Sequence, residues 1–174
     1  MKAPETWVPL AEVARPHGVR GELRLKLFNT DSDVLLRLDE VLVRLADGEE
    51  QEVSIDRARR ADQAILLKLH AVDDRDKADG LRGALICVRR RDFPPLENEE
   101  FYVCDVLGVR VHAGGAEIGT VRDLKSYPTV DVLVVRADDG GMDYEVPLVD
   151  AIVENMDLPG ETITLKTLEG VERG

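Results

Sequence analysis

Residues 22–28, ELRLKLF, alternate leucine with charged residues at a period of two, and this pattern constrains the fold more than any other stretch. In an extended chain the three leucines share one face, while Glu22, Arg24 and Lys26 share the other. A strand with one apolar face has to bury that face against the rest of a sheet. The pattern therefore predicts a half-buried β-strand with two cations facing outward.

Similar short apolar runs, separated by turn signals, continue along the chain and predict further strands. A single helix is predicted within residues 73–83, where Asp73 or Asp74 is the N-cap and Gly83 the C-terminal stop. The predicted strands are 8–16, 22–28, 40–46, 49–60, 63–69, 84–90, 106–112, 117–124, 130–137, 143–149 and 161–168. This succession predicts an all-β fold of two β-barrel domains, with one short helix in the first domain.

The stretch FPPLENEE, residues 93–100, has the composition of a stiff and solvated connector. The charge balance changes at the same point. Residues 1–92 hold 17 Lys and Arg against 18 Asp and Glu, whereas residues 93–174 hold 6 against 17. We therefore expect an N-terminal domain at 1–92, a linker at 93–100 and a C-terminal domain at 101–174. An acidic domain repels phosphate and attracts a basic partner, although it also serves solubility.

The sequence gives little sign of a targeting segment, a disulfide or a metal site. The N-terminus lacks an apolar stretch of signal-sequence length, and no run approaches the roughly 20 apolar residues of a membrane span. Cys87 and Cys104 lie in apolar, strand-like runs without CxxC spacing, so neither a disulfide framework nor a metal site is predicted. These features indicate a cytoplasmic protein with reduced thiols.

The sequence contains none of the usual enzyme signatures. GxSxG, HExxH and GxxxxGK[ST] are absent, and no glycine-rich loop lies between a strand and a helix. The histidines are far apart, and the adjacent carboxylates are explained by a helix cap and a turn. We therefore expect a non-catalytic protein with no cofactor and no metal.

The segment before residues 22–28 is the main candidate for a binding site. Glycines in PHGVRG allow the backbone to approach a ligand, and cations are concentrated over residues 15–26. These features predict contact with RNA phosphates, while a plain turn with solvated cations is the alternative. The candidate residues are Arg15, His17, Gly18, Arg20, Gly21, Arg24 and Lys26.

Phe101 and Tyr102 form a second candidate site, because aromatic residues are only 4% of the chain. Adjacent residues of an extended segment face opposite ways. One ring can then pack inward while the other stays available as an anchor for a protein partner. We expect Phe101 to pack inward, and we leave Tyr102 open between the two roles.

Four stretches, in this order, resemble the RimM family of ribosome maturation factors. They are ARPHGVRGELRLKLF, DDRDKADGLRGALICVRR, LENEEFYVCDVLGVRVH and YEVPLVDAIVENMDLPGETITL. The resemblance covers almost the whole chain. It implies an N-terminal barrel related to translation-factor barrels and a C-terminal PRC-type barrel.

The resemblance also implies a function. Members are non-enzymatic assembly factors that bind the immature 30S small ribosomal subunit and assist head assembly and 16S rRNA maturation. The implied direct partner is the nineteenth protein of the small-subunit series, and a monomer is expected. The family has Tyr-Tyr at the start of its second barrel, where this chain has Phe101-Tyr102, so the first hydroxyl is missing. The segment SYPTVDVLVV also departs from the usual glycine-rich approach through Pro128.

Two rival functions remain open at this point. A stand-alone β-barrel RNA-binding module would bind bare RNA tightly and with strong salt dependence. An enzyme would use His17 with Arg15 or Arg20 on a phosphorylated substrate, and its turnover would depend on the imidazole.

Overall fold

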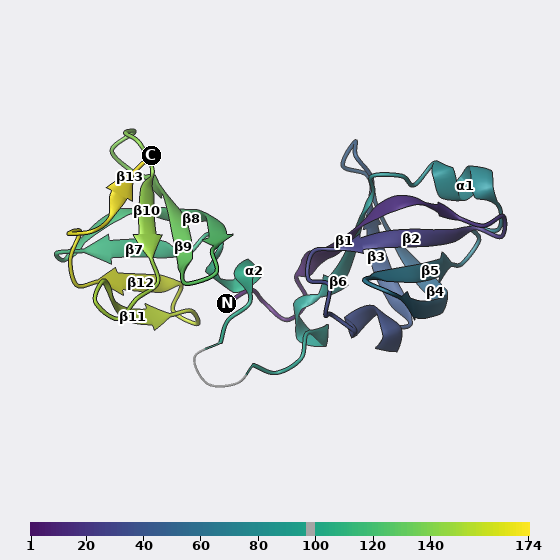
Figure 1. Cartoon of the computed structure of the whole chain (residues 1–174), viewed down its shortest axis with the longest axis horizontal. Coiled ribbons are helices and arrows are strands. Elements are labelled where there is room, and N and C mark those ends of the chain that lie inside the picture. The colour runs from purple at the N-terminus through teal and green to yellow at the C-terminus, as the bar shows by residue number, and fades with distance from the viewer. Residues whose placement is uncertain (97–99) are drawn as a thin grey trace. The chain divides into compact units, whose positions relative to one another are not determined.

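The computed structural model describes residues 1–96 and 100–174, which divide into two compact units. We call Ala3–Pro95 the N-terminal unit, and Leu96–Gly174 together with Met1–Lys2 the C-terminal unit (Figure 1). The predicted all-β fold with two β domains is confirmed. The predicted linker at 93–100 spans the division, and its residues 97–99 lie outside the described part of the chain.

The N-terminal unit is a closed antiparallel barrel with the strand order β1-β2-β5-β4-β3-β6. Its elements are β1 (Trp7–His17), β2 (Glu22–Leu27), the 3-10 helix η1 (Val34–Arg37), β3 (Glu40–Arg44), β4 (Glu50–Ala61), β5 (Ala64–Leu69), α1 (Arg75–Asp79), β6 (Leu85–Arg89) and the 3-10 helix η2 (Arg90–Asp92). Closure pairs every strand on both sides, which removes the exposed edges of an open sheet.

The interior of this barrel contains almost only aliphatic side chains, as the scarcity of aromatic residues requires. The leucines of β2 are at most 5% exposed, which confirms the period-two prediction. The largest fully buried side chains of the unit include Leu23, Leu25, Leu35, Ile65, Leu67, Leu69, Ile86, Val13 and Val41. Burying each such side chain stabilises the fold by about 1.5–3 kcal/mol.

The helix α1 is shorter than predicted. Asp74 is its N-cap, and the carboxylate accepts a hydrogen bond from the backbone N–H of Lys77 at 2.8 Å. The helix ends at the cap residue Gly80, so the predicted stop at Gly83 is wrong; Gly83 instead has φ +80° in the turn that follows. Ala78 is fully buried in the barrel core, and α1 therefore covers part of the barrel.

The C-terminal unit is a seven-stranded, barrel-like sheet with the order β11-β12-β7-β8-β9-β10-β13. Its elements are α2 (Val103–Val106), β7 (Arg110–Ala113), β8 (Ala116–Ser126), β9 (Asp131–Ala137), β10 (Tyr144–Pro147), β11 (Val153–Asp157), β12 (Thr162–Leu165) and β13 (Glu172–Arg173). All pairs are antiparallel except β12 with β7, which run parallel. Its core includes Val106, Val109, Val111, Val121, Leu133, Val135, Val146, Ile163 and Leu165.

Several expectations from the sequence are corrected. Residues 103–106 form α2, so the strand predicted from 106 begins at Arg110, and Cys104 lies in a helix rather than in a strand. The single predicted helix is joined by α2 and by two 3-10 helices. The strands β11 and β13 were not predicted. In the described residues both cysteines are free, and no group of three metal-ligating side chains occurs.

Membrane insertion through a helix has no support in the described residues. Their longest helix, α1, has five residues, whereas a bilayer span needs about 20.

The hairpin between β1 and β2 is held against the segment that follows β5. Gly21 is buried with φ +84°, and a Cβ placed there would lie 1.9 Å from the backbone oxygen of Val72. The Arg75 guanidinium donates a hydrogen bond to the carbonyl of Gly18 at 3.0 Å. The hairpin therefore has a fixed position on the barrel, because backbone packs on backbone at Gly21.

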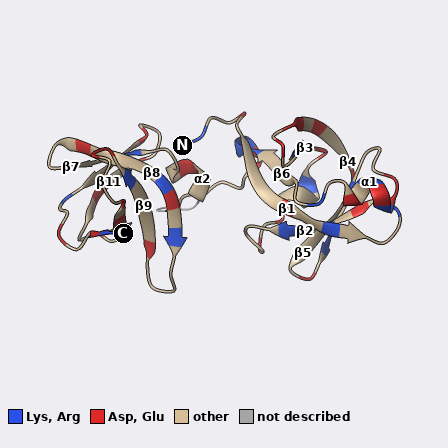
Figure 2. Ribbon diagram, turned by 90° about the horizontal axis from the view of Figure 1, so that it is seen from above, with Lys and Arg blue, Asp and Glu red and all other residues tan. Residues whose placement is uncertain are grey.

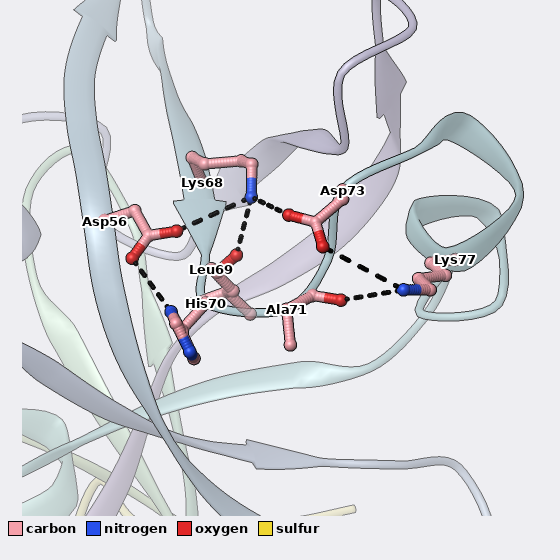
Figure 3. A network of polar contacts seen from close by, with 7 residues as sticks. All are labelled: Asp56, Lys68, Leu69, His70, Ala71, Asp73 and Lys77. Atoms are coloured by element: carbon pink, nitrogen blue, oxygen red, sulfur yellow. Dashed lines mark hydrogen bonds and ion pairs between the residues drawn. The ribbon is translucent and has the colours of Figure 1, made fainter.

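The segment that receives Gly21 is itself fixed by the ionic network of Figure 3. Lys68 Nζ lies 3.2 Å from Asp73 Oδ1 and 3.6 Å from Asp56 Oδ2, and it donates to the Leu69 carbonyl at 3.0 Å. Lys77 Nζ donates to the Ala71 carbonyl at 3.2 Å. Lys68 is therefore a structural cation that ties β5 to residues 69–73.

We predict that Gly21→Ala lowers the free energy of unfolding of the N-terminal unit by about 2 kcal/mol or more, because the new Cβ displaces the Val72 backbone. Gly18→Ala is the matched control. Gly18 also has positive φ, +67°, but nothing lies within 4 Å of an added Cβ, so only about 1 kcal/mol of backbone strain is expected. Urea unfolding followed by fluorescence of Trp7, the single tryptophan, measures both changes. Equal losses would contradict the close approach at Gly21.

Candidate nucleic-acid interface

Charged side chains form two outward rows across β1, β2, β5 and β4. In the first row Arg15 of β1 is opposite Arg24 of β2. Arg24 in turn is opposite Leu66 of β5, and Leu66 is opposite Arg59 of β4. Directly opposite residues have Cβ atoms only about 4.5–5.5 Å apart. Arginines from three strands therefore lie in one row on the outside of the barrel, and two of them, Arg24 and Arg59, flank Leu66.

The second row lies one step nearer to the β1–β2 hairpin. His17 is opposite Glu22, Glu22 is opposite Lys68, and Lys68 is opposite Arg57. Lys26 extends the pattern in the other direction, opposite Glu12. We call the outward surface formed by Arg15, Arg24, Lys26, Arg57 and Arg59 the basic face.

Two β-bulges bring arginines to this face. Val13 is fully buried, so strict alternation would turn the Arg15 side chain toward the core. The register shifts between Val13 and Arg15, however, and Pro16 is the buried residue instead. In β4 the register shifts between Ile55 and Arg57. Each extra residue reverses which side chains point outward. The bulges therefore expose arginines that plain alternation would have directed into the core.

Most cations of the basic face lack an acidic partner. Across the described residues, no carboxylate oxygen lies within 4.0 Å of Arg15, Arg24, Lys26 or Arg57, whereas most other cations of the unit are in ion pairs. Blue segments along β2 mark part of this face in Figure 2. Arg15 directly opposite Arg24 is a like-charge pair, which is destabilising. A bound anion would remove this repulsion.

Arg59 is the exception, since it forms an ion pair with Glu22 across β5. Its Nε and a terminal nitrogen lie 3.3 and 3.2 Å from the two carboxylate oxygens. This hydrogen-bonded pair, opposed in part by burial, holds the pKa of Glu22 below the ordinary glutamate value. Leu66, only 2% exposed although it faces outward, lies between Arg24 and Arg59 in the sheet. We infer that the arginine stems cover it.

The structure brings together some of the candidates predicted from sequence and separates others. Arg15, His17, Arg24 and Lys26 lie on the same outward surface of the sheet. Arg20 is exposed in the hairpin that follows. Gly18 has positive φ in the turn of the hairpin, and Gly21 has positive φ where its backbone packs against Val72. Sequence analysis missed Arg57 and Arg59, because only the pairing of β4 with β5 places them here.

The aromatic pair lies in the C-terminal unit, at the start of α2. Phe101 is half-buried and packs against the core of this unit. Tyr102 is the N-cap residue of α2, and its carbonyl accepts a hydrogen bond from the backbone N–H of Asp105 at 2.8 Å. Its side chain is also half-buried and retains some exposure. The inward packing expected for Phe101 agrees with these contacts.

The acidic excess of residues 93–174 is not neutralised within the unit. Four of the six cations already pair with carboxylates: Arg110 with Glu117, Arg122 with Asp143, Lys125 with Glu145 and Arg173 with Asp139. With 17 acidic residues against 6 basic ones, a large negative excess faces solvent. Such a surface attracts a basic partner and repels phosphate.

Comparisons with known proteins give one consistent result. The model of the RimM N-terminal domain matches residues 8–93, and the model of the RimM PRC barrel domain matches residues 103–171. A protein of Sorangium cellulosum called ribosome maturation factor RimM is 48% identical over 95% of this chain and 97% of its own length. One of Myxococcus xanthus with the same name is 33% identical over 100% of this chain and 93% of its own. The solution structure of the N-terminal domain of RimM from Thermus thermophilus is 26% identical, covers 52% of this chain and 98% of that chain, and has a TM-score of 0.42.

The Glu22–Arg59 pair predicts an acid-sensitive contribution to stability. Because the folded-state pKa of Glu22 is lowered, the ion pair stabilises the fold fully above the ordinary glutamate pKa, and the contribution is lost as pH falls through the folded value. In Glu22→Gln this contribution should be absent, so the stability difference from wild type should shrink on acidification. Urea unfolding at a series of acidic pH values, followed by Trp7 fluorescence, checks this. A difference that does not change with pH would contradict it.

Proposed function

Because the chain belongs to the RimM family, we propose that it is a ribosome maturation factor that binds the immature 30S subunit and assists head assembly and 16S rRNA maturation. The observation that carries the proposal beyond family membership is the concentration of unpaired cations on the basic face. In this proposal Arg15, Arg24, Lys26 and Arg57 contact rRNA phosphates, and His17 and Arg20 extend the contact toward the hairpin.

The C-terminal unit is proposed to bind a head ribosomal protein, the nineteenth of the small-subunit series. Ribosomal proteins are generally basic, and the uncompensated carboxylates of residues 93–174 favour a basic partner. Tyr102 is proposed as an aromatic anchor for this contact, because it is only half-buried and its backbone is fixed at the N-terminus of α2. Phe101 supports it from the core side.

The proposed mechanism is stabilisation by occupancy. The protein binds the partly assembled head better than the mature head and so increases the population of the assembly-competent arrangement. It leaves when the mature surface no longer offers the same contacts. No covalent step is needed, so in this proposal the protein is non-enzymatic, monomeric and cytoplasmic, and it uses no cofactor.

Co-sedimentation with small-subunit precursors tests the rRNA contact. We predict that the double variant Arg24→Glu with Lys26→Glu binds precursors at least about tenfold more weakly, and that the logarithmic salt dependence of binding loses a slope of about 2. Arg37→Glu is the matched control. Arg37 is exposed in η1, has no carboxylate within 4.0 Å among the described residues, and lies off the basic face.

Three results would redirect the proposal. A loss per changed charge that is the same for the double variant and for Arg37→Glu would show an effect of net charge rather than of the basic face. Tight binding to bare RNA without any affinity for precursors or head proteins would identify a stand-alone RNA-binding module. Turnover of a phosphorylated compound that His17→Ala abolishes would identify an enzyme.

Replacing the two aromatic residues separately tests the protein contact. We predict that Tyr102→Ala weakens binding to the purified head protein by roughly tenfold or more, because a half-exposed aromatic anchor is lost, while circular dichroism and the unfolding midpoint change little. Phe101→Ala should instead destabilise the C-terminal unit by about 2–4 kcal/mol, because its ring packs against that core. Unfolding of the Tyr102→Ala variant, or unchanged affinity, would assign Tyr102 to packing alone.

A further inference from the structure

Phe28 is an exposed aromatic residue at the end of the strand that carries the unpaired cations. Phe28 is 56% exposed, whereas the preceding Leu27 is 5% exposed. The backbone N–H of Phe28 donates to the carbonyl of Leu10 at 3.1 Å, which continues the β1–β2 ladder one residue past β2. Phe28 lies one residue past the end of β2, and its exposure places its side chain at the surface, two residues along the chain from Lys26 and four from Arg24.

The ring of Phe28 differs from the other aromatic rings of its unit. An arginine guanidinium lies 4.3 Å from the ring centre of Trp7, and another lies 5.5 Å from that of Phe93. Within the described residues, no cation or aromatic ring is in contact with Phe28. Its ring face is open to a partner from outside the chain.

The backbone around Phe28 is held in place on both sides. The ladder to Leu10 fixes the strand, and the following turn is closed by the Ser32 N–H donating to the Asn29 carbonyl at 3.1 Å. Arg60 reaches over from β4 and donates to the carbonyls of Thr30 and Ser32 at 2.8 and 2.7 Å. The ring is thus presented from a preorganised backbone, which lowers the entropic cost of binding.

We infer that Phe28 stacks on an unpaired nucleobase of RNA whose adjacent phosphates lie on Lys26 and Arg24. This inference rests on the proposed function and names its ligand: a single-stranded segment of rRNA. A basic track that ends at an open aromatic ring is the arrangement that single-stranded nucleic-acid binders use, because every base has a face that can stack. A duplex would keep its bases stacked within the helix and out of reach.

The charged residues that follow Phe28 in the sequence indicate on which side of Phe28 the RNA backbone lies. Asp31 and Asp33 follow in the next turn, and Asp33 is paired with Arg60. Asp31 is exposed and has no cation within 4.0 Å among the described residues, so it disfavours phosphate on that side, whereas Arg24 and Arg15 favour the RNA backbone on the other side of Phe28. The base on Phe28 is the terminal contact of the basic face.

The test measures binding of the full chain to two single-stranded oligomers of about 12 nucleotides. One is RNA with all bases, and the other has the same sugar-phosphate backbone without bases. Fluorescence anisotropy at low salt compares wild type with Phe28→Leu, which keeps apolar volume but has no ring face, and with Phe28→Tyr, which keeps the ring. We expect Phe28→Leu to lose about five- to tenfold in affinity for the RNA, and Phe28→Tyr to stay within about twofold.

The abasic oligomer separates stacking from charge. It should bind wild type and Phe28→Leu equally, because only phosphate contacts remain. Equal binding of the RNA by wild type and Phe28→Leu, or an equal loss for both oligomers, would overturn the stacking role. With such a result, wild type would still co-sediment with precursors, and the proposed function would stand. If wild type did not co-sediment with precursors, the proposed function itself would be overturned.

An unchanged urea midpoint confirms that Phe28→Leu is folded.

Discussion

The burial of the β2 leucines is the interaction on which the rest of the N-terminal unit depends. Leu23, Leu25 and Leu27 enter the barrel core, and because side chains alternate, their burial forces Arg24 and Lys26 outward. A slip of one residue in register would place two cations in an aliphatic interior at a cost of several kcal/mol. The hydrophobic core thus fixes the chemistry of the outer surface. A shift in the register of the core strand would therefore also change which charges lie on the outer surface.

Charge is organised differently in the two units, although both are built mainly of β-strands. In the N-terminal unit the total is nearly balanced, and the basic face arises because many acidic residues pair with other cations elsewhere. In residues 93–174 four of the six cations are in local ion pairs, and most carboxylates of the described residues remain without a cation. The pattern of pairing, more than the net charge, decides which partner each unit attracts. An anionic partner suits the first unit and a cationic partner the second.

Sequence alone predicted the elements whose signal is local. The period-two pattern of β2 and the N-cap at Asp74 depend on neighbouring residues, and both were found where they were expected. The strand β11 was missed because Glu154, Asn155 and Asp157 give it no apolar alternation; its pairing with β12 defines it. The four-residue helix α2 is too short to show a helical period. The contribution of Arg57 and Arg59 was missed for a further reason, since a bulge reverses the direction of side chains without leaving a mark in the sequence.

The proposed contacts, one on each unit, would together let the protein distinguish an immature particle from its parts. In the proposed function, bare rRNA offers a ligand to the basic face alone, and a free head protein offers one to the acidic unit alone. A precursor offers both, and the second contact then forms at an effective concentration set by the connection between the units. Binding to the precursor exceeds binding to either component without any new contact. Maturation needs to remove only one of the two surfaces to release the protein, because the remaining contact is weak by itself.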